Sequence, residues 1–217
     1  MTELENDKLW LEYFYPNTHV LKNKLGITDY NKLKEEEATL SFEKLLELMD
    51  NPISMNCDKN HLIEIHKYLF NDIYPFAGEY REVNMQKEAG SFLFISEYRS
   101  IDGFLDELFM EIDDDLSKCR NKHDFCDILS RLYTQLIFCH PFREGNGRSI
   151  REFIREFSMI KSKELGIGDL ELDWSLINRD ELNEYIEVAH IFPNMTQMLF
   201  EKALVNINNV SNENRLK

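Results

Sequence analysis

The chain is short of the residues that break or bend regular secondary structure. Its 217 residues include only 8 glycines and 5 prolines. Collagen-like and low-complexity chains contain far more of both, so these classes are excluded. With 43% hydrophobic and 12% aromatic residues, a chain of this length is expected to bury a real core as one domain or a tight pair. The few turn-forming residues favour long regular elements.

Positive charge is also in deficit. The chain carries 25 Lys and Arg residues against 40 Asp and Glu residues, which gives a formal net charge of −15. Broad binding to nucleic acid or to anionic lipid requires a basic surface, so neither a nucleic acid nor a membrane is expected as a partner. A small local phosphate site is compatible with this balance.

Two further absences bear on the compartment. The four cysteines form no CxxC pair and are irregularly spaced, which favours buried reduced thiols over disulfides. No apolar run approaches the ~20 residues that span a bilayer, and the acidic start from Met1 to Lys8 is unlike a secretory signal. The sequence therefore predicts a soluble, cytoplasmic protein.

Apolar residues recur at helical spacing along most of the chain. The predicted helices are 40–49, a helix that starts after Asp58 as its N-cap, 105–112 ending in the acidic run 113–115, 125–139, 150–157, 179–188 and 193–205. The stretch from Gly78 to Ile95 differs, because β-branched and aromatic residues flank a glycine-containing turn, as in a β-hairpin. The predicted architecture is mainly α with one hairpin.

The most informative stretch runs from His140 to Arg151, between the two most regular predicted helices. Gly145-Asn146-Gly147 at a helix start leaves backbone N–H groups unpaired, and glycine lets an anion approach them, so a phosphate nest is expected. Arg148 and Arg151 are three residues apart and project from one helix face, where they suit phosphate contacts. Residues 140–155 hold four arginines against two glutamates, a local reversal of the overall charge.

Two side chains beside this nest have chemistry suited to catalysis. Glu144 offers the single carboxylate with which Mg²⁺ is commonly held beside phosphates. His140 titrates near neutral pH and is able to accept a proton from a hydroxyl group. Phe142 is expected to point into the core. The alternative is that the glycines form a simple interhelical turn, but the ordered combination of His, Glu, Asn and two Arg argues against it.

The same segment fits the pattern HxFx(D/E)GNGRxxR at every specified position and so resembles the signature of Fic-domain proteins. Residues 65–81 resemble the Fic segment that leads into a flap hairpin, and residues 15–26 resemble the opening of many bacterial Fic proteins. The resemblance implies the Fic fold, a helical bundle with one β-hairpin flap over the active site. It implies a single domain over 1–217, with a core at about 58–200 and an N-terminal helical extension at about 10–57.

Fic enzymes typically transfer AMP from ATP to a Ser, Thr or Tyr hydroxyl of a target protein and release pyrophosphate. The resemblance therefore implies a protein adenylyltransferase with Mg²⁺ as cofactor, and with ATP and a hydroxyl-bearing target protein, including the chain itself, as substrates. By position, the implied roles are His140 as the base, Glu144 as the Mg²⁺ ligand, Gly145, Asn146 and Gly147 as the anion hole with Asn146 also touching phosphate, and Arg148 and Arg151 as the grip on the β- and γ-phosphates.

The resemblance also implies contacts outside the motif. The hairpin around Lys87 would pair with an extended target segment, and Phe92 or Phe94 would clamp the target side chain, with plain hairpin packing as the alternative for both rings. Tyr185 and Asn178 fall where the family often contacts the nucleoside, although roles in the core or in a turn are open for them too.

The transferred group has several alternatives. In the related Doc kinases a lysine takes the place of Gly147, so the glycine favours AMP transfer over phosphate transfer. UMP and phosphocholine transfer remain open, as do a repressed or non-catalytic module that binds ATP and peptide, and a hydrolase that removes AMP.

Regulation is also open. Many Fic proteins are inhibited by a helix with the pattern (S/T)xxxE(G/N), whose glutamate pairs with the second motif arginine. Glu35 and Glu213 each sit in an imperfect copy of this pattern, and Glu35 is preferred because a well-formed helix follows it. The other readings are a separate small antitoxin, suggested by the opening shared with antitoxin-paired relatives, and no inhibitor at all. A second copy of the chain is a further partner left open.

Overall fold

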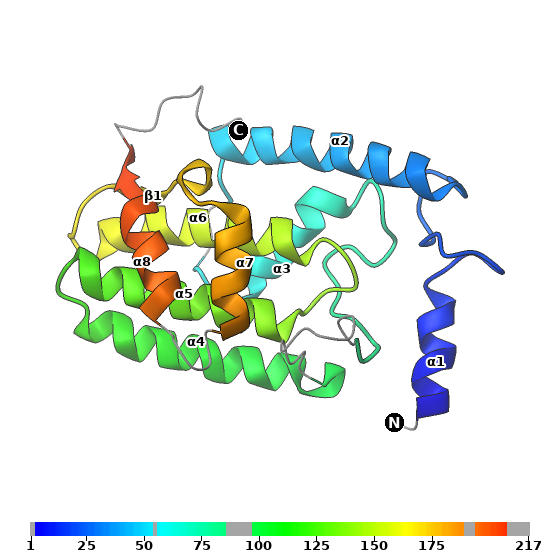
Figure 1. The fold of residues 1–217 in the computed structure, drawn as a ribbon, viewed down its shortest axis with the longest axis horizontal. Helices are drawn as coiled ribbons and strands as arrows, with labels where there is room; N and C mark the ends of the chain where they lie inside the picture. The colour runs from blue at the N-terminus through cyan, green and yellow to red at the C-terminus, as the bar shows by residue number, and fades with distance from the viewer. Residues whose placement is uncertain (1–2, 54–55, 86–96, 189–193, 208–217) are drawn as a thin grey trace.

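The computed structural model describes residues 3–53, 56–85, 97–188 and 194–207 (Figure 1). The helices in these ranges are α1 Glu3–Glu12, α2 Tyr30–Asp50, α3 Lys59–Phe70, α4 Ile101–Lys118, α5 Lys122–Cys139, α6 Asn146–Glu164, α7 Arg179–Val188 and α8 Asn194–Ala203. Two 3-10 turns, η1 Tyr98–Ser100 and η2 Trp174–Leu176, and two short strands, β1 Leu170–Leu172 and β2 Leu204–Asn206, complete the described elements. The prediction of a mainly α protein is confirmed.

The predicted helices are present, and several extend beyond their apolar pattern. Asp58 caps α3 as expected, because its carboxylate accepts hydrogen bonds from the backbone N–H groups of Asn60 and His61. Helix α4 continues through the acidic run 113–115, where Asp115 pairs with Arg131 of α5. The prediction of a helix up to residue 205 is wrong at its end, because residues 204–206 leave the helix and pair with β1.

The sheet lies away from the hairpin predicted from the sequence. Strands β1 and β2 are antiparallel, with Leu170 opposite Asn206 and Leu172 opposite Leu204. Residues 78–85, the first part of the predicted hairpin, contain turns and irregular backbone but no strand, while 86–96 lie outside the described residues. The flap therefore stays a prediction.

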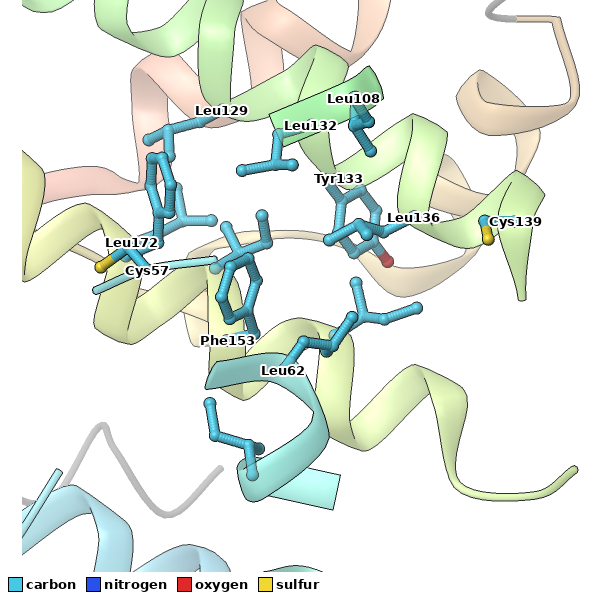
Figure 2. Packing of buried hydrophobic residues seen from close by; sticks show 14 of the residues in the cluster. Cys57, Leu62, Leu108, Leu129, Leu132, Tyr133, Leu136, Cys139, Phe153 and Leu172 are labelled. Carbon is cyan, nitrogen blue, oxygen red and sulfur yellow. The ribbon is translucent and has the colours of Figure 1, made fainter. Parts of the chain in front are cut away.

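Helices α5 and α6 form the centre of the bundle. Helix α5 packs against α4, α6 and α8, and α6 packs against α3, α5 and β1 (Figure 1). Between them lie fully buried apolar side chains, including Leu62, Leu132, Leu136 and Phe153 (Figure 2). All four cysteines are buried and free, as predicted. This core fixes the end of α5 against the start of α6, where the motif lies.

A buried ionic cluster fastens the far part of α6. Arg155 is 4% exposed and donates hydrogen bonds to the carboxylate of Glu152, to that of Glu171 in β1 and to the backbone carbonyl of Leu48 in α2. The cluster thus ties three elements together.

Among the described residues, no helix is both long enough and apolar enough to cross a membrane.

Candidate active site

The polypeptide makes a sharp turn where α5 ends. Pro141 disfavours a helical conformation at the preceding residue, so the helix stops at Cys139. His140 adopts left-handed backbone angles, with φ 47° and ψ 60°, while its N–H still donates to the carbonyl of Leu136 at 3.0 Å. Its half-buried side chain lines a cleft with the rest of the motif.

Side chains inside the turn hold it closed. Phe142 is fully buried and stacks on the ring of His66, with 3.8 Å between the ring centroids, as expected for a core residue. The side-chain oxygen of Asn146 accepts from the N–H of Phe142 at 2.8 Å, and its amide nitrogen donates to the carbonyl of Phe142 at 2.7 Å. Both polar atoms of this side chain are thus engaged within the turn, so its expected contact with phosphate has no support from this geometry.

The residue that precedes helix α6 as its N-cap is a glycine, Gly145, and any other residue there would be strained. Gly145 has φ 80°, and a Cβ atom placed there would lie 2.4 Å from the ring of Phe70. The N–H of Gly145 donates to the Glu144 carboxylate at 3.0 Å, which orients that carboxylate at the helix start. The phosphate nest that the sequence predicts at this helix start stays a prediction.

The cleft over this helix start has a volume of about 560 Å³. The side chains or backbone that line it belong to Lys34, Glu37, Ala38, Met85, His140, Arg143, Glu144, Gly145, Asn146, Gly147, Arg148, Arg151 and Arg179. Five of these residues are cationic and two are anionic. The structure therefore brings together all seven motif residues predicted for the site, in a cleft suited to a polyanion.

Helix α2 supplies an acidic contact that the sequence did not point to. The carboxylate of Glu37 pairs with the guanidinium of Arg148, which also donates to the hydroxyl of Ser41 at 2.7 Å. The Tyr74 hydroxyl donates to the other oxygen of Glu37. Glu35, the residue predicted to be inhibitory, is exposed on the same helix. The glutamate that faces the motif is thus Glu37, and the arginine that it binds is the first of the motif, Arg148.

His66 is a second residue that sequence reasoning missed. Its Nδ1 accepts from the N–H of Gly78 at 2.8 Å, so the proton resides on Nε2, which donates to the carbonyl of Glu144 at 3.0 Å. Burial lowers the pKa of His66 to about 4, so the ring is neutral at pH 7. Its place beneath Phe142 makes it a support for the motif turn.

Other predicted residues lie elsewhere. Tyr185 is half-buried on α7 and donates to the carboxylate of Glu181 at 2.7 Å, while Asn178 caps the start of that helix. From α7, it is Arg179 that reaches the cleft. The flap residues Lys87, Phe92 and Phe94, and the second inhibitory candidate Glu213, lie outside the described residues.

Comparison with known proteins relates this geometry to a family. Residues 56–158 match the family model described as Fic/DOC family. The chain is 31% identical over 177 residues to the protein adenylyltransferase VbhT of Bartonella schoenbuchensis, and 31% identical over 159 residues to the probable protein adenylyltransferase y4lH of Sinorhizobium fredii. The matches cover 78% and 72% of this chain. They span 34% of VbhT, about a third of its length, and 80% of y4lH.

Solved structures give the same relation. The BepC protein of Bartonella tribocorum with bound AMPPNP superimposes with a TM-score of 0.76 at 25% identity, over 90% of this chain and 97% of that one. An N-terminal Fic domain from Bartonella quintana with bound ADP gives a TM-score of 0.77 at 25% identity, over 95% of this chain and 98% of that one. Both similar proteins hold an adenine nucleotide.

Proposed function

Because the chain belongs to the Fic/DOC family, we propose that it is a protein adenylyltransferase that moves AMP from ATP to a hydroxyl side chain of a target protein. The observation that carries the proposal is the cleft in which His140, Glu144, the glycine turn and both motif arginines meet. The adenylyltransferase names of VbhT and y4lH, and the nucleotides in the two Bartonella structures, support it.

The proposed reaction is a displacement at the α-phosphate of ATP. His140 accepts the proton of the target hydroxyl, whose oxygen bonds to the α-phosphorus. The bond from that phosphorus to the bridging oxygen breaks, and pyrophosphate leaves. The backbone N–H groups at the start of α6 stabilise charge on the α-phosphate, and Arg148 and Arg151 bind the leaving phosphates. Positioning and charge stabilisation do most of the work in such transfers.

Glu144 is the proposed ligand for Mg²⁺. Its carboxylate lines the cleft and is oriented by the Gly145 N–H, so a hard oxygen faces the space proposed for the phosphates. Mg²⁺ commonly binds through one or two carboxylates together with phosphate oxygens and water, which fits a site with one carboxylate. When bound, the ion neutralises phosphate charge. The cofactor assignment rests on this donor chemistry.

The space at Gly147 favours AMP transfer over phosphate transfer. A Cβ atom at this position would lie 3.3 Å from Nη1 of Arg151, so a long side chain here would crowd the arginine. With glycine at position 147, this space stays open for Arg151 and for the phosphate that it is proposed to bind. We therefore place the α-phosphate, rather than the γ-phosphate, next to His140.

Labelled ATP tests the assignment directly. With Mg²⁺ and a lysate as the source of target, label at the α-phosphate is expected on protein, and label at the γ-phosphate is expected only in released pyrophosphate. The measurement is autoradiography of the separated proteins, followed by mass spectrometry for an added AMP. Transfer of the γ-label instead would make the protein a kinase, and a UMP or phosphocholine adduct would reassign the donor.

A repressed state is the second candidate, favoured by the contact between Glu37 and Arg148. The two side chains are 13% and 23% exposed, so the pair is largely shielded from water. The carboxylate of Glu37 takes up a hydrogen-bond donor of the Arg148 guanidinium, which is proposed to bind a phosphate. It also adds a negative charge to the cleft. Both effects oppose the binding of ATP, which is itself strongly negative.

Replacing Glu37 with glutamine tests this repression. We expect ATP to bind about 3- to 10-fold more tightly, which corresponds to ~1 kcal/mol for the release of a partly shielded ion pair. Isothermal titration calorimetry with ATP in the presence of Mg²⁺ measures the change in the dissociation constant. Glu35→Gln removes the same charge from an exposed position of α2 and serves as the matched control. Weaker binding by Glu37→Gln would show instead that Glu37 orients Arg148 for ATP.

A further inference from the structure

Arg81 is a buried arginine that lies outside the motif. It lies in the irregular segment after α3 and is 1% exposed. Three hydrogen bonds of its side chain go to backbone carbonyls: Nε donates to His140 at 2.8 Å, Nη2 to Cys139 at 3.2 Å and Nη1 to Val83 at 2.6 Å. The backbone N–H of Arg81 also donates to the carbonyl of Pro141 at 2.9 Å. Three consecutive carbonyls around His140 thus bind one residue.

These carbonyls need partners because α5 ends there. The last carbonyls of a helix have no partner within the helix, and they carry the negative end of its dipole. A guanidinium group offers several donors in a fixed plane together with a full positive charge. Arg81 therefore caps the C-terminus of α5 from outside the helix, at the residue proposed as the base.

The cap matters because the backbone of His140 has left-handed angles. Left-handed angles in a non-glycine residue cost roughly 1–2 kcal/mol, and such residues persist where several contacts determine them. The direction of the imidazole depends on these backbone angles. Loss of the cap would let residues 139–141 relax toward ordinary angles and turn the ring away from the cleft.

We propose that Arg81 is a positioning residue that holds His140 in its left-handed conformation, so that the imidazole faces the target hydroxyl. This inference rests on the proposed function for the role of the base. The bond to Val83 extends the effect, since the same guanidinium ties the motif turn to residues 81–84, which enter the predicted flap.

Arg81→Lys is the first test. Lysine keeps the charge but has a single nitrogen, which cannot match the planar set of three bonds. We expect kcat for AMP transfer to fall by about 100-fold, the cost of a small misplacement of a reacting group, and KM for ATP to stay within ~2-fold. Arg155→Lys, which changes an equally buried arginine outside the cleft, is expected to lower thermal stability while leaving kcat within ~2-fold. Equal losses in kcat and in ATP binding for Arg81→Lys would overturn the positioning role.

Chemical rescue separates positioning from general damage. In Arg81→Ala, millimolar guanidinium is expected to restore at least ~10-fold of the lost kcat by occupying the vacated site. Guanidinium should give no such gain in Arg155→Ala. A folded Arg81→Ala protein that retains wild-type kcat would refute the proposal, as would one that guanidinium leaves unchanged.

A measurement on the unmodified protein covers the case in which the variants do not fold. In ¹⁵N NMR spectra, the Nε–H of Arg81 is expected to exchange slowly with water because it is buried and bonded to the carbonyl of His140. Rapid exchange of this proton would overturn the cap. Because the signal does not depend on turnover, a protein that transfers no AMP but shows the protected Nε–H would remove the proposed function while leaving the cap in place.

Discussion

Replacing His140 with alanine is expected to lower kcat for AMP transfer by about 10²- to 10⁴-fold, the usual contribution of a positioned general base. The imidazole is the proton acceptor proposed for the target hydroxyl, and it lines the cleft beside the glycine turn that is proposed to bind the α-phosphate. The dissociation constant for ATP should change by less than ~2-fold, because the nest and the arginines are untouched. Single-turnover transfer from α-labelled ATP and titration with unlabelled ATP measure the two quantities separately.

The matched control is His123→Ala. This histidine lies near the start of α5, and its side chain is 73% exposed and contacts Glu201 of α8 rather than the cleft. We expect this variant to transfer AMP at the wild-type rate. If His140→Ala also retained that rate, the base would have to be another group, and the proposed reaction would lose its first step.

The sequence predicts the local structure best in the motif segment, where neighbouring residues determine the backbone geometry. From His140 to Arg151 the chain passes from a helix end, through a proline and two glycines, to a helix start, and each feature restricts the backbone locally. Phe142 could be assigned to the core from the same pattern, and it is fully buried. The conformation of such a segment is therefore determined mainly by its own local sequence.

The supporting residues could not be predicted in this way because their partners are distant in sequence. Arg81 binds backbone carbonyls 58 and 59 positions away, and His66 binds one 78 positions away. A backbone carbonyl leaves no trace in the identity of the residue that carries it. The resemblance over residues 65–81 includes both side chains, but nothing in the order of residues assigns Arg81 or His66 to the motif turn.

The preference for Glu35 over Glu213, with Glu37 not considered, shows a different limit. Glu35 is predicted because the residues around it match the spacing of a short inhibitory pattern. On a helix, two positions rotate a side chain by about 200°, so Glu35 and Glu37 point to nearly opposite sides. Glu37 and Ser41 are four apart, share one face and both contact Arg148. Which face of α2 meets the motif depends on how that helix packs, which the pattern alone does not contain.

Gly145→Ala is expected to destabilise the fold by about 2–5 kcal/mol. Left-handed backbone costs a non-glycine residue roughly 1–2 kcal/mol, and overpacking typically adds about 1–3 kcal/mol. The overpacking arises because the new methyl group would lie 2.4 Å from the ring of Phe70, which is fully buried and stands next to His66 and Tyr74. Urea unfolding followed by circular dichroism measures the loss.

Relief of that clash requires movement of the start of α6, so ATP binding should weaken along with stability. Gly103→Ala is the matched control, because a Cβ at this exposed position in α4 has no atom within 4 Å beyond its chain neighbours and the backbone of its own helix. Alanine there should be neutral or stabilise the fold by up to ~1 kcal/mol, since it restricts the unfolded chain and favours helix. A Gly145→Ala protein with wild-type stability and ATP affinity would mean that Phe70 moves aside freely and that the left-handed turn is not needed. The nest would then depend on the arginines rather than on the backbone at Gly145.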